Sequence, residues 1–106
     1  MGQRPTRVPP GVGIIEEPSF SERIDELSRI YPRMAEVKAA IDWAVSHDPE
    51  WGTPLQSNQN YRIMKLPCAP GMPDMRVLYR YGLRERAEQM AYLLYLDPIE
   101  PSEAEF

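Results

Sequence analysis

The chain has 106 residues, which is enough for one small domain with a two-layer hydrophobic core. Its 42% apolar and 26% charged content is typical of globular proteins, and no apolar run approaches the ~20 residues that a membrane-spanning helix needs. The first 13 residues are polar and contain prolines where a secretory signal would have an apolar segment. We therefore expect a cytoplasmic protein with no membrane association.

Metal and disulfide chemistry find little support in the composition. Cys68 is the only cysteine, so the chain cannot form an internal disulfide. With His47 as the only histidine, the sequence lacks a set of soft ligands for zinc. We expect no metal and no cofactor.

The charges are distributed unevenly along the chain. The net charge of −4 taken alone argues against a nucleic-acid-binding protein. Residues 61–96, however, hold six basic and three acidic side chains, whereas residues 97–106 hold four acidic side chains and no basic one. Ten of the twelve cations are arginine, whose guanidinium group suits bidentate binding of phosphate or carboxylate. The basic segment is therefore the candidate binding region.

The first half of the chain predicts a strand followed by two helices. Residues 1–11 form a proline-containing flexible leader, and the β-branched segment 12–17 predicts a strand at or next to a sheet edge. Ser19 and Glu22 fit a capping box, which predicts that a helix begins at Ser19 and ends at Pro32. A second helix is predicted over residues 33–46. Apolar residues share one face of each helix: Phe20, Ile24, Leu27, Ile30 and Tyr31 in the first, and Met34, Val37, Ile41, Ala44 and Val45 in the second.

Trp43 lies roughly opposite the apolar face of the second helix, because two residues turn a helix by about 200°. An exposed tryptophan can be packed under a loop or can anchor a partner protein, and the sequence leaves both open.

The second half of the chain predicts three strands. Turn-forming residues dominate segments 47–60 and 67–74, whereas segments 61–66 and 75–81 are rich in β-branched and aromatic residues. Residues 90–96 are apolar on both faces, as in a central strand. Residues 83–89 are interpreted as a turn with some helical propensity, and a helix reaching into 90–96 is the competing interpretation. Residues 98–106 are expected to form an acidic flexible tail.

These elements predict an α+β fold in a single domain over residues 12–97. An N-terminal strand, a helical hairpin and a three-stranded antiparallel meander would form one sheet with the helices on one face. In segment 75–81, side-chain alternation places Val77 and Tyr79 toward the helices and Arg76 and Arg80 on the uncovered face.

Residues 13–96 resemble the RelE/ParE toxin superfamily of bacterial type II toxin–antitoxin systems. The resemblance rests on Pro18-Ser19-Phe20 before the first helix, on the Gly52-Thr53-Pro54-Leu55 loop, on Tyr61-Arg62, and above all on Arg76-Val77-Leu78-Tyr79-Arg80. It implies a small cytoplasmic protein that a cognate antitoxin neutralises. RelE-like members cut mRNA on the ribosome, whereas ParE-like members inhibit DNA gyrase and are not nucleases.

For the nuclease branch, the resemblance implies that basic side chains stabilise negative charge on the phosphate that is cut. Arg76 matches the family's strand arginine and is the first catalytic candidate, with Arg62 and Arg80 expected beside it. Lys65, Arg84 and Arg86 are the candidates for RNA binding. Taken singly, any of these side chains is better explained as a solvated surface cation, and it is their occurrence together on two neighbouring strands that brings the binding interpretation level with it.

The chain departs from the family pattern after the last strand. RelE-like nucleases often carry an arginine, histidine or tyrosine there, whereas this chain continues with Asp97-Pro98. Tyr92 or Tyr95 could carry a proton, although a tyrosine in an apolar strand is more often part of the core. His47 would reach such a site only through loop folding.

Two further functions therefore stay open beside the mRNA endonuclease. One is a non-catalytic, ParE-like or degenerate toxin that acts by protein–protein binding, for example on gyrase, with Trp43 as partner anchor. The other is an accessory protein, such as a phage protein, that has kept the fold for another use.

Overall fold

The computed structural model describes residues 11–68 and 70–99, so most of the predicted leader and the predicted tail from residue 100 onward lie outside the described residues. The elements follow one another as β1 (Gly13–Glu16), α1 (Pro18–Ser28), α2 (Met34–His47), β2 (Thr53–Pro54), β3 (Tyr61–Leu66), β4 (Met75–Arg80), α3 (Leu83–Glu88) and β5 (Met90–Pro98).

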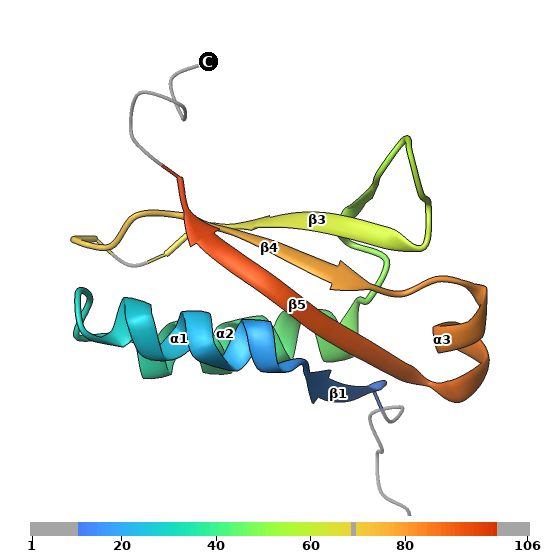
Figure 1. Cartoon of the computed structure of the whole chain (residues 1–106), viewed down its shortest axis with the longest axis horizontal. Coiled ribbons are helices and arrows are strands. Elements are labelled where there is room, and N and C mark those ends of the chain that lie inside the picture. The colour runs from blue at the N-terminus through green and yellow to red at the C-terminus, as the bar shows by residue number, and fades with distance from the viewer. Residues whose placement is uncertain (1–10, 69, 100–106) are drawn as a thin grey trace, which may run out of the picture.

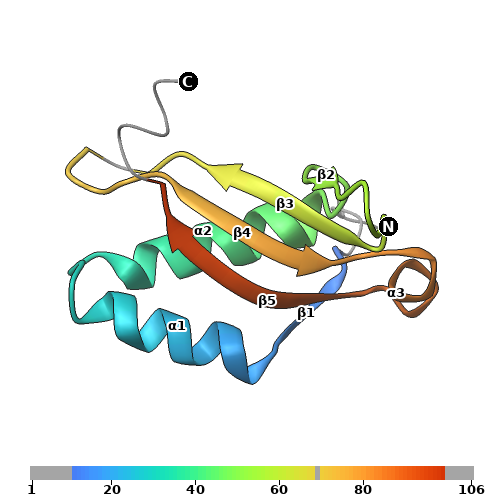
Figure 2. The ribbon, with the colours of Figure 1, turned by 45° about the horizontal axis from the view of Figure 1, so that its top comes forward.

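The strands form one sheet in the order β1-β5-β4-β3-β2 (Figures 1 and 2; β2 is labelled in Figure 2). β3, β4 and β5 pair antiparallel as the predicted meander, and β1 pairs parallel with β5 at one edge. α1 and α2 cover one face of this sheet, while no element among residues 11–68 and 70–99 covers the other face over β3 and β4 (Figure 2). The predicted α+β architecture is confirmed, including the central position of the last strand and the edge position of the first.

The core lies between the helical hairpin and the covered face of the sheet. In β4, burial alternates as predicted, with Met75, Val77 and Tyr79 fully buried and Arg76 and Arg80 half-exposed. The predicted apolar face of α2 is buried throughout: Met34, Val37, Ile41, Ala44 and Val45. No helix in the described part of the chain combines the length and apolarity needed to cross a bilayer.

The start and end of α1 differ from the prediction. The helix begins at Pro18 with Glu17 as N-cap, so the capping box predicted at Ser19 does not form. Proline is pre-organised for the first helical position, and the Ser19 hydroxyl instead donates to the Leu94 carbonyl of β5 at 2.6 Å. The helix ends at Ser28, and Ile30, predicted on its apolar face, is exposed.

The structure resolves the ambiguity over residues 83–96 into a helix and a strand. α3 ends at Glu88, and Gln89 adopts a left-handed conformation (φ 59°) that reverses the chain into β5. β5 then runs to Pro98, beyond its predicted end at Leu96, and the backbone N–H of buried Ile99 donates to the Asp74 carbonyl at 2.8 Å.

The loop predicted over residues 47–60 contains the two-residue strand β2, which the sequence analysis missed. β2 pairs Thr53 and Pro54 with β3 at the sheet edge, a position where proline is tolerated because its missing N–H faces away from the ladder.

Candidate nucleic-acid interface

The open face of the sheet is built from alternate residues of the three meander strands. We define it as Tyr61, Ile63 and Lys65 of β3, Arg76, Leu78 and Arg80 of β4, and Tyr92, Tyr95 and Asp97 of β5. These residues are cross-strand partners, and their side chains point away from the helices because their strand neighbours face the core. The face is therefore a mixed basic and aromatic surface.

At one end of the open face, Lys65, Arg76 and Asp97 form a row across three strands. Their Cα atoms are paired in register, which places the three side chains next to one another. Arg76 Nη2 lies 3.3 Å from Asp97 Oδ2. Lys65 is exposed, so the row presents a mobile ammonium beside a guanidinium that a carboxylate orients.

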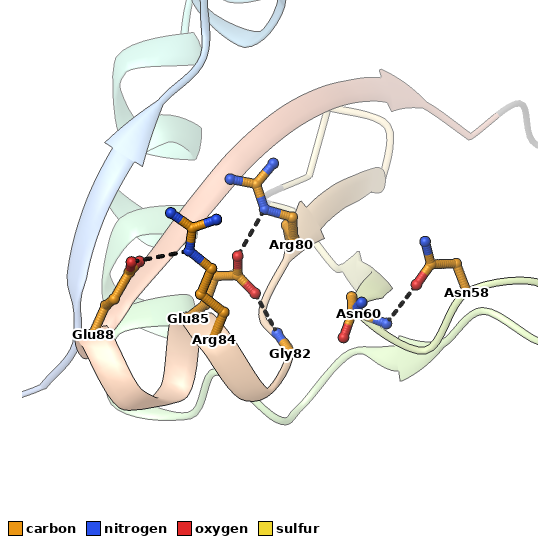
Figure 3. A network of polar contacts seen from close by, with 7 residues as sticks. All are labelled: Asn58, Asn60, Arg80, Gly82, Arg84, Glu85 and Glu88. Atoms are coloured by element: carbon orange, nitrogen blue, oxygen red, sulfur yellow. Dashed lines mark hydrogen bonds and ion pairs between the residues drawn. The ribbon is translucent and has the colours of Figure 1, made fainter.

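At the other end of the face, Arg80 lies between two tyrosines. Its Cζ atom lies 4.3 Å from the ring centroid of Tyr92 on β5, and Tyr61 on β3 is its cross-strand partner. Its Nε donates to Glu85 Oε2 at 2.9 Å (Figure 3). Partial burial opposes charging, but the interactions with Glu85 and Tyr61 outweigh it and raise the pKa of Arg80. Arg80 is thus held in one orientation.

Glu85 is the buried carboxylate that orients Arg80. Its Oε1 accepts from the Gly82 backbone N–H at 2.9 Å while Oε2 takes the Arg80 bond (Figure 3). Burial would raise the pKa of Glu85, but these N–H groups and the guanidinium lower it below its usual value. The carboxylate therefore stays ionised at neutral pH.

Arg62 does not lie beside Arg76 and Arg80, and this part of the predicted site is wrong. Arg62 pairs with Tyr79 and shares the parity of buried Met64, so it points to the helix side of the sheet. Its Nη1 donates to the carbonyls of Glu50 (3.0 Å) and Gly52 (2.8 Å). Arg62 therefore holds the segment before β2 in place.

The two α3 arginines predicted to bind RNA separate in the structure. Arg84 is largely exposed and pairs with Glu88 at 3.2 Å (Figure 3), near the Arg80 end of the open face. Arg86 pairs with Glu50 at 3.0 Å, next to the segment that Arg62 holds. The structure thus brings Lys65, Arg76, Arg80 and Arg84 to one surface and leaves Arg62 and Arg86 elsewhere.

Trp43 is 63% exposed, as its helical position predicts, and stacks on His47 with ring centroids 4.5 Å apart. The two rings line a shallow hollow together with Trp51, which is 49% exposed. Trp51 was not predicted to contribute to this surface, although a tryptophan in a turn-rich segment is a visible signal for an exposed aromatic residue. His47 lies with this aromatic surface, and its Nδ1 is 2.8 Å from the Trp43 carbonyl, so it is remote from the open face.

On β5, the open face also carries two tyrosines and a carboxylate beside its basic side chains. Tyr92, which the sequence favours as a core residue, is half-exposed beside Arg80, and Tyr95 is exposed. Asp97 is the carboxylate that adjoins Lys65 and Arg76. Within the described residues, no group of three or more histidine, cysteine or acidic side chains gathers to hold a metal ion.

A search with protein-family models and a search of curated proteins each found no match. Among solved structures, the chain is similar to a chain of the toxin–antitoxin complex RelBE2 from Mycobacterium tuberculosis, with a TM-score of 0.62 and 18% sequence identity. The match covers 84% of this chain and 92% of the other. At this identity the likeness establishes the fold, which is RelE-like, as the resemblance of residues 13–96 implies.

Proposed function

We propose that this protein is the toxin of a type II toxin–antitoxin pair and that it cuts mRNA on the ribosome through its open face. The observation that carries this proposal is the Lys65–Arg76–Asp97 row, which gathers two cations and a carboxylate on an uncovered surface. The RelE-like fold supports the same function.

The row contains the groups that cleavage by a 2′-hydroxyl requires. The hydroxyl oxygen attacks the adjacent phosphorus, its proton passes to a base, and the bond to the 5′-oxygen breaks as that oxygen takes up a proton. Arg76 and Lys65 would stabilise the charge that gathers on the phosphate. Asp97, beside Arg76, would accept the proton of the 2′-hydroxyl, and the Lys65 ammonium would supply the proton that the 5′-oxygen takes up.

Induced expression in bacteria tests this function. Wild-type protein should stop growth. The double variant Lys65→Ala/Arg76→Ala should not, because it keeps the fold intact but removes both phosphate ligands. Arg33→Ala is the control, since it removes an arginine–glutamate pair at the start of α2, on the helix side. Normal growth with soluble wild-type protein would contradict the proposal.

The aromatic surface of Trp43 and Trp51 favours a second candidate function, inhibition of a protein target such as gyrase without RNA cleavage. Exposed tryptophans on an apolar hollow are typical anchors of protein interfaces. In that case, Trp43→Ala/Trp51→Ala should abolish growth arrest while Lys65→Ala/Arg76→Ala retains it. The two double variants thus give opposite results under the two functions. In either case an antitoxin would be the cytoplasmic partner that neutralises the protein.

A further inference from the structure

A pocket of about 550 Å³ opens at the Arg80 end of the open face, between α3 and the turn before β3 (Figure 3). Its volume lies in the range of small-ligand sites. Along β4, Arg80 is four residues from Arg76, which is about 13 Å at the usual strand rise. The pocket is therefore separate from the Lys65–Arg76–Asp97 row, but one strand of RNA lying along β4 would reach both.

The pocket has a mostly polar lining with two residues that can contact a nucleobase through apolar surface. These are Tyr61 of β3 and Leu83 at the start of α3. Leu83 is 79% exposed, the highest value among the large apolar side chains of the described residues. Aromatic and aliphatic side chains of this kind hold an unstacked base by contact with its faces.

Two asparagines supply the hydrogen-bonding edge of the pocket. The Asn58 Oδ1 atom accepts from the Asn60 backbone N–H at 3.0 Å, which leaves the Asn58 amino group as a free donor (Figure 3). The Asn60 carbonyl accepts from the Tyr81 backbone N–H at 2.8 Å. The Asn60 side chain also lies so close to Gly82 that a Cβ at position 82 would collide with it. The Asn58 amide is thus held by a hydrogen bond, and the Asn60 side chain lies against Gly82.

The charges of the pocket suit one phosphate. Arg80 and Arg84 line it, and each guanidinium has one carboxylate partner, Glu85 for Arg80 and Glu88 for Arg84. Glu85 binds the Nε of Arg80 and leaves the terminal nitrogens of the guanidinium toward the open face. Tyr92 holds the plane of the same guanidinium, which makes Arg80 a pre-oriented fork for a phosphate.

We propose that this pocket binds one nucleotide of single-stranded RNA, with its base between Tyr61 and Leu83, its edge toward Asn58 and Asn60, and its phosphate on Arg80 and Arg84. This inference rests on the proposed function, since it assigns a second contact to the RNA that the open face holds. It makes the pocket a source of sequence preference at a position away from the cut, because the Lys65–Arg76–Asp97 row is assigned to the phosphate that is cut.

The test is a titration of the isotope-labelled full chain, followed by the NMR shifts of its backbone amides. The probes are the four ribonucleoside 5′-monophosphates, inorganic phosphate and a hexaglutamate peptide. At least one nucleotide should bind saturably, with shifts centred on residues 58–61 and 82–85. It should bind at least about fivefold more tightly than phosphate, because stacking of the base adds to the anion contact. The hexaglutamate peptide should bind no better than phosphate.

Two variants and one control locate the site. Arg80→Ala should weaken nucleotide binding at least about tenfold. The loss of Arg80 also leaves Glu85 without its cation, so a second variant that keeps the fold is needed. Arg84 has an 84% exposed side chain, and Arg84→Ala should weaken nucleotide binding about two- to fivefold. Arg33→Ala removes a similar exposed arginine–glutamate pair and should change nothing.

Absence of saturable nucleotide binding would overturn the inference, as would equal affinity for phosphate or for hexaglutamate, or an Arg33→Ala effect equal to that of Arg84→Ala. Growth arrest with no nucleotide binding would refute the pocket and leave the proposed function standing. Nucleotide binding without growth arrest would refute the proposed function and leave the nucleotide pocket standing.

Discussion

At the scale of single residues, the face of the strand decides what each arginine does. Arg62 and Arg76 lie on adjacent antiparallel strands, yet one binds backbone carbonyls on the helix side and the other forms an ion pair on the open face. The segment Tyr61–Leu66 has apolar residues on both faces of the strand, so its sequence does not reveal which face packs on the core. Only pairing with β4, whose alternation is clear, places Arg62 correctly.

This difference predicts that two alanine substitutions destabilise the protein to different extents. Arg62→Ala removes the donor of the Glu50 and Gly52 carbonyls and should lower the free energy of unfolding by about 1–3 kcal/mol in urea denaturation. Arg76→Ala removes a half-exposed surface pair and should cost less than about 1 kcal/mol. A larger loss of stability for Arg76→Ala would refute this assignment.

Tyr79 supports the same segment from the core and predicts a pH dependence. Its hydroxyl donates to the Pro49 carbonyl at 2.7 Å and accepts from the Gly52 N–H at 2.8 Å. Burial raises the pKa of Tyr79 above its ordinary value of 10.0. A pKa raised on folding gives stability that is present below the unfolded pKa and is lost as the pH rises through the folded one.

Stability should therefore fall above about pH 10, and Tyr79→Phe should reduce this alkaline dependence while costing about 1–3 kcal/mol at pH 7, because the Gly52 N–H loses its acceptor. Thermal unfolding between pH 7 and 11 measures both effects. Tyr95→Phe, at an exposed position, is the control and should match the wild type at each pH. Equal curves for Tyr79→Phe and wild type would contradict the role of the hydroxyl.

At the scale of elements, the connection from α3 to β5 depends on one backbone conformation. The spacing of Leu83, Ala87, Met90 and Leu94 is compatible with a continuous helix, and local propensity does not show where it stops. The left-handed Gln89 stops it, and pairing with β1 and β4 makes the rest a strand. A left-handed glutamine carries little sequence signal, which is why the boundary was not predictable.

Substitutions at position 89 test this connection. Gln89→Gly should leave stability unchanged or raise it by up to ~1 kcal/mol, because glycine adopts φ 59° without strain. Gln89→Val should lower stability by more than ~1 kcal/mol, because a β-branched residue is strained there. Urea unfolding of the three proteins would contradict the account if valine and glycine gave the same stability.

At the scale of the whole molecule, much of the fold follows from the sequence. The alternation of buried and exposed positions in Met75–Tyr81 fits only a strand, and the spacing of apolar residues in Met34–Val45 fits only a helix. The two layers and the meander were therefore predictable. The candidate site was less predictable than the fold, because it depends on tertiary contacts between segments that are distant in sequence. The Glu85 bond to Arg80, the pocket beside Asn60 and the exposure of Trp51 all arise where loops meet the sheet.

The central claim is that the open face of the sheet cuts mRNA. The most direct measurement is cleavage of an mRNA bound to purified, programmed ribosomes under single-turnover conditions. Wild-type protein and Arg33→Ala should cut at the same rate, and Lys65→Ala/Arg76→Ala should be slower by about 10²–10³-fold, as expected when transition-state charge loses its ligands. Absence of cleavage by the folded wild-type protein, or full activity of the double variant, would contradict the claim.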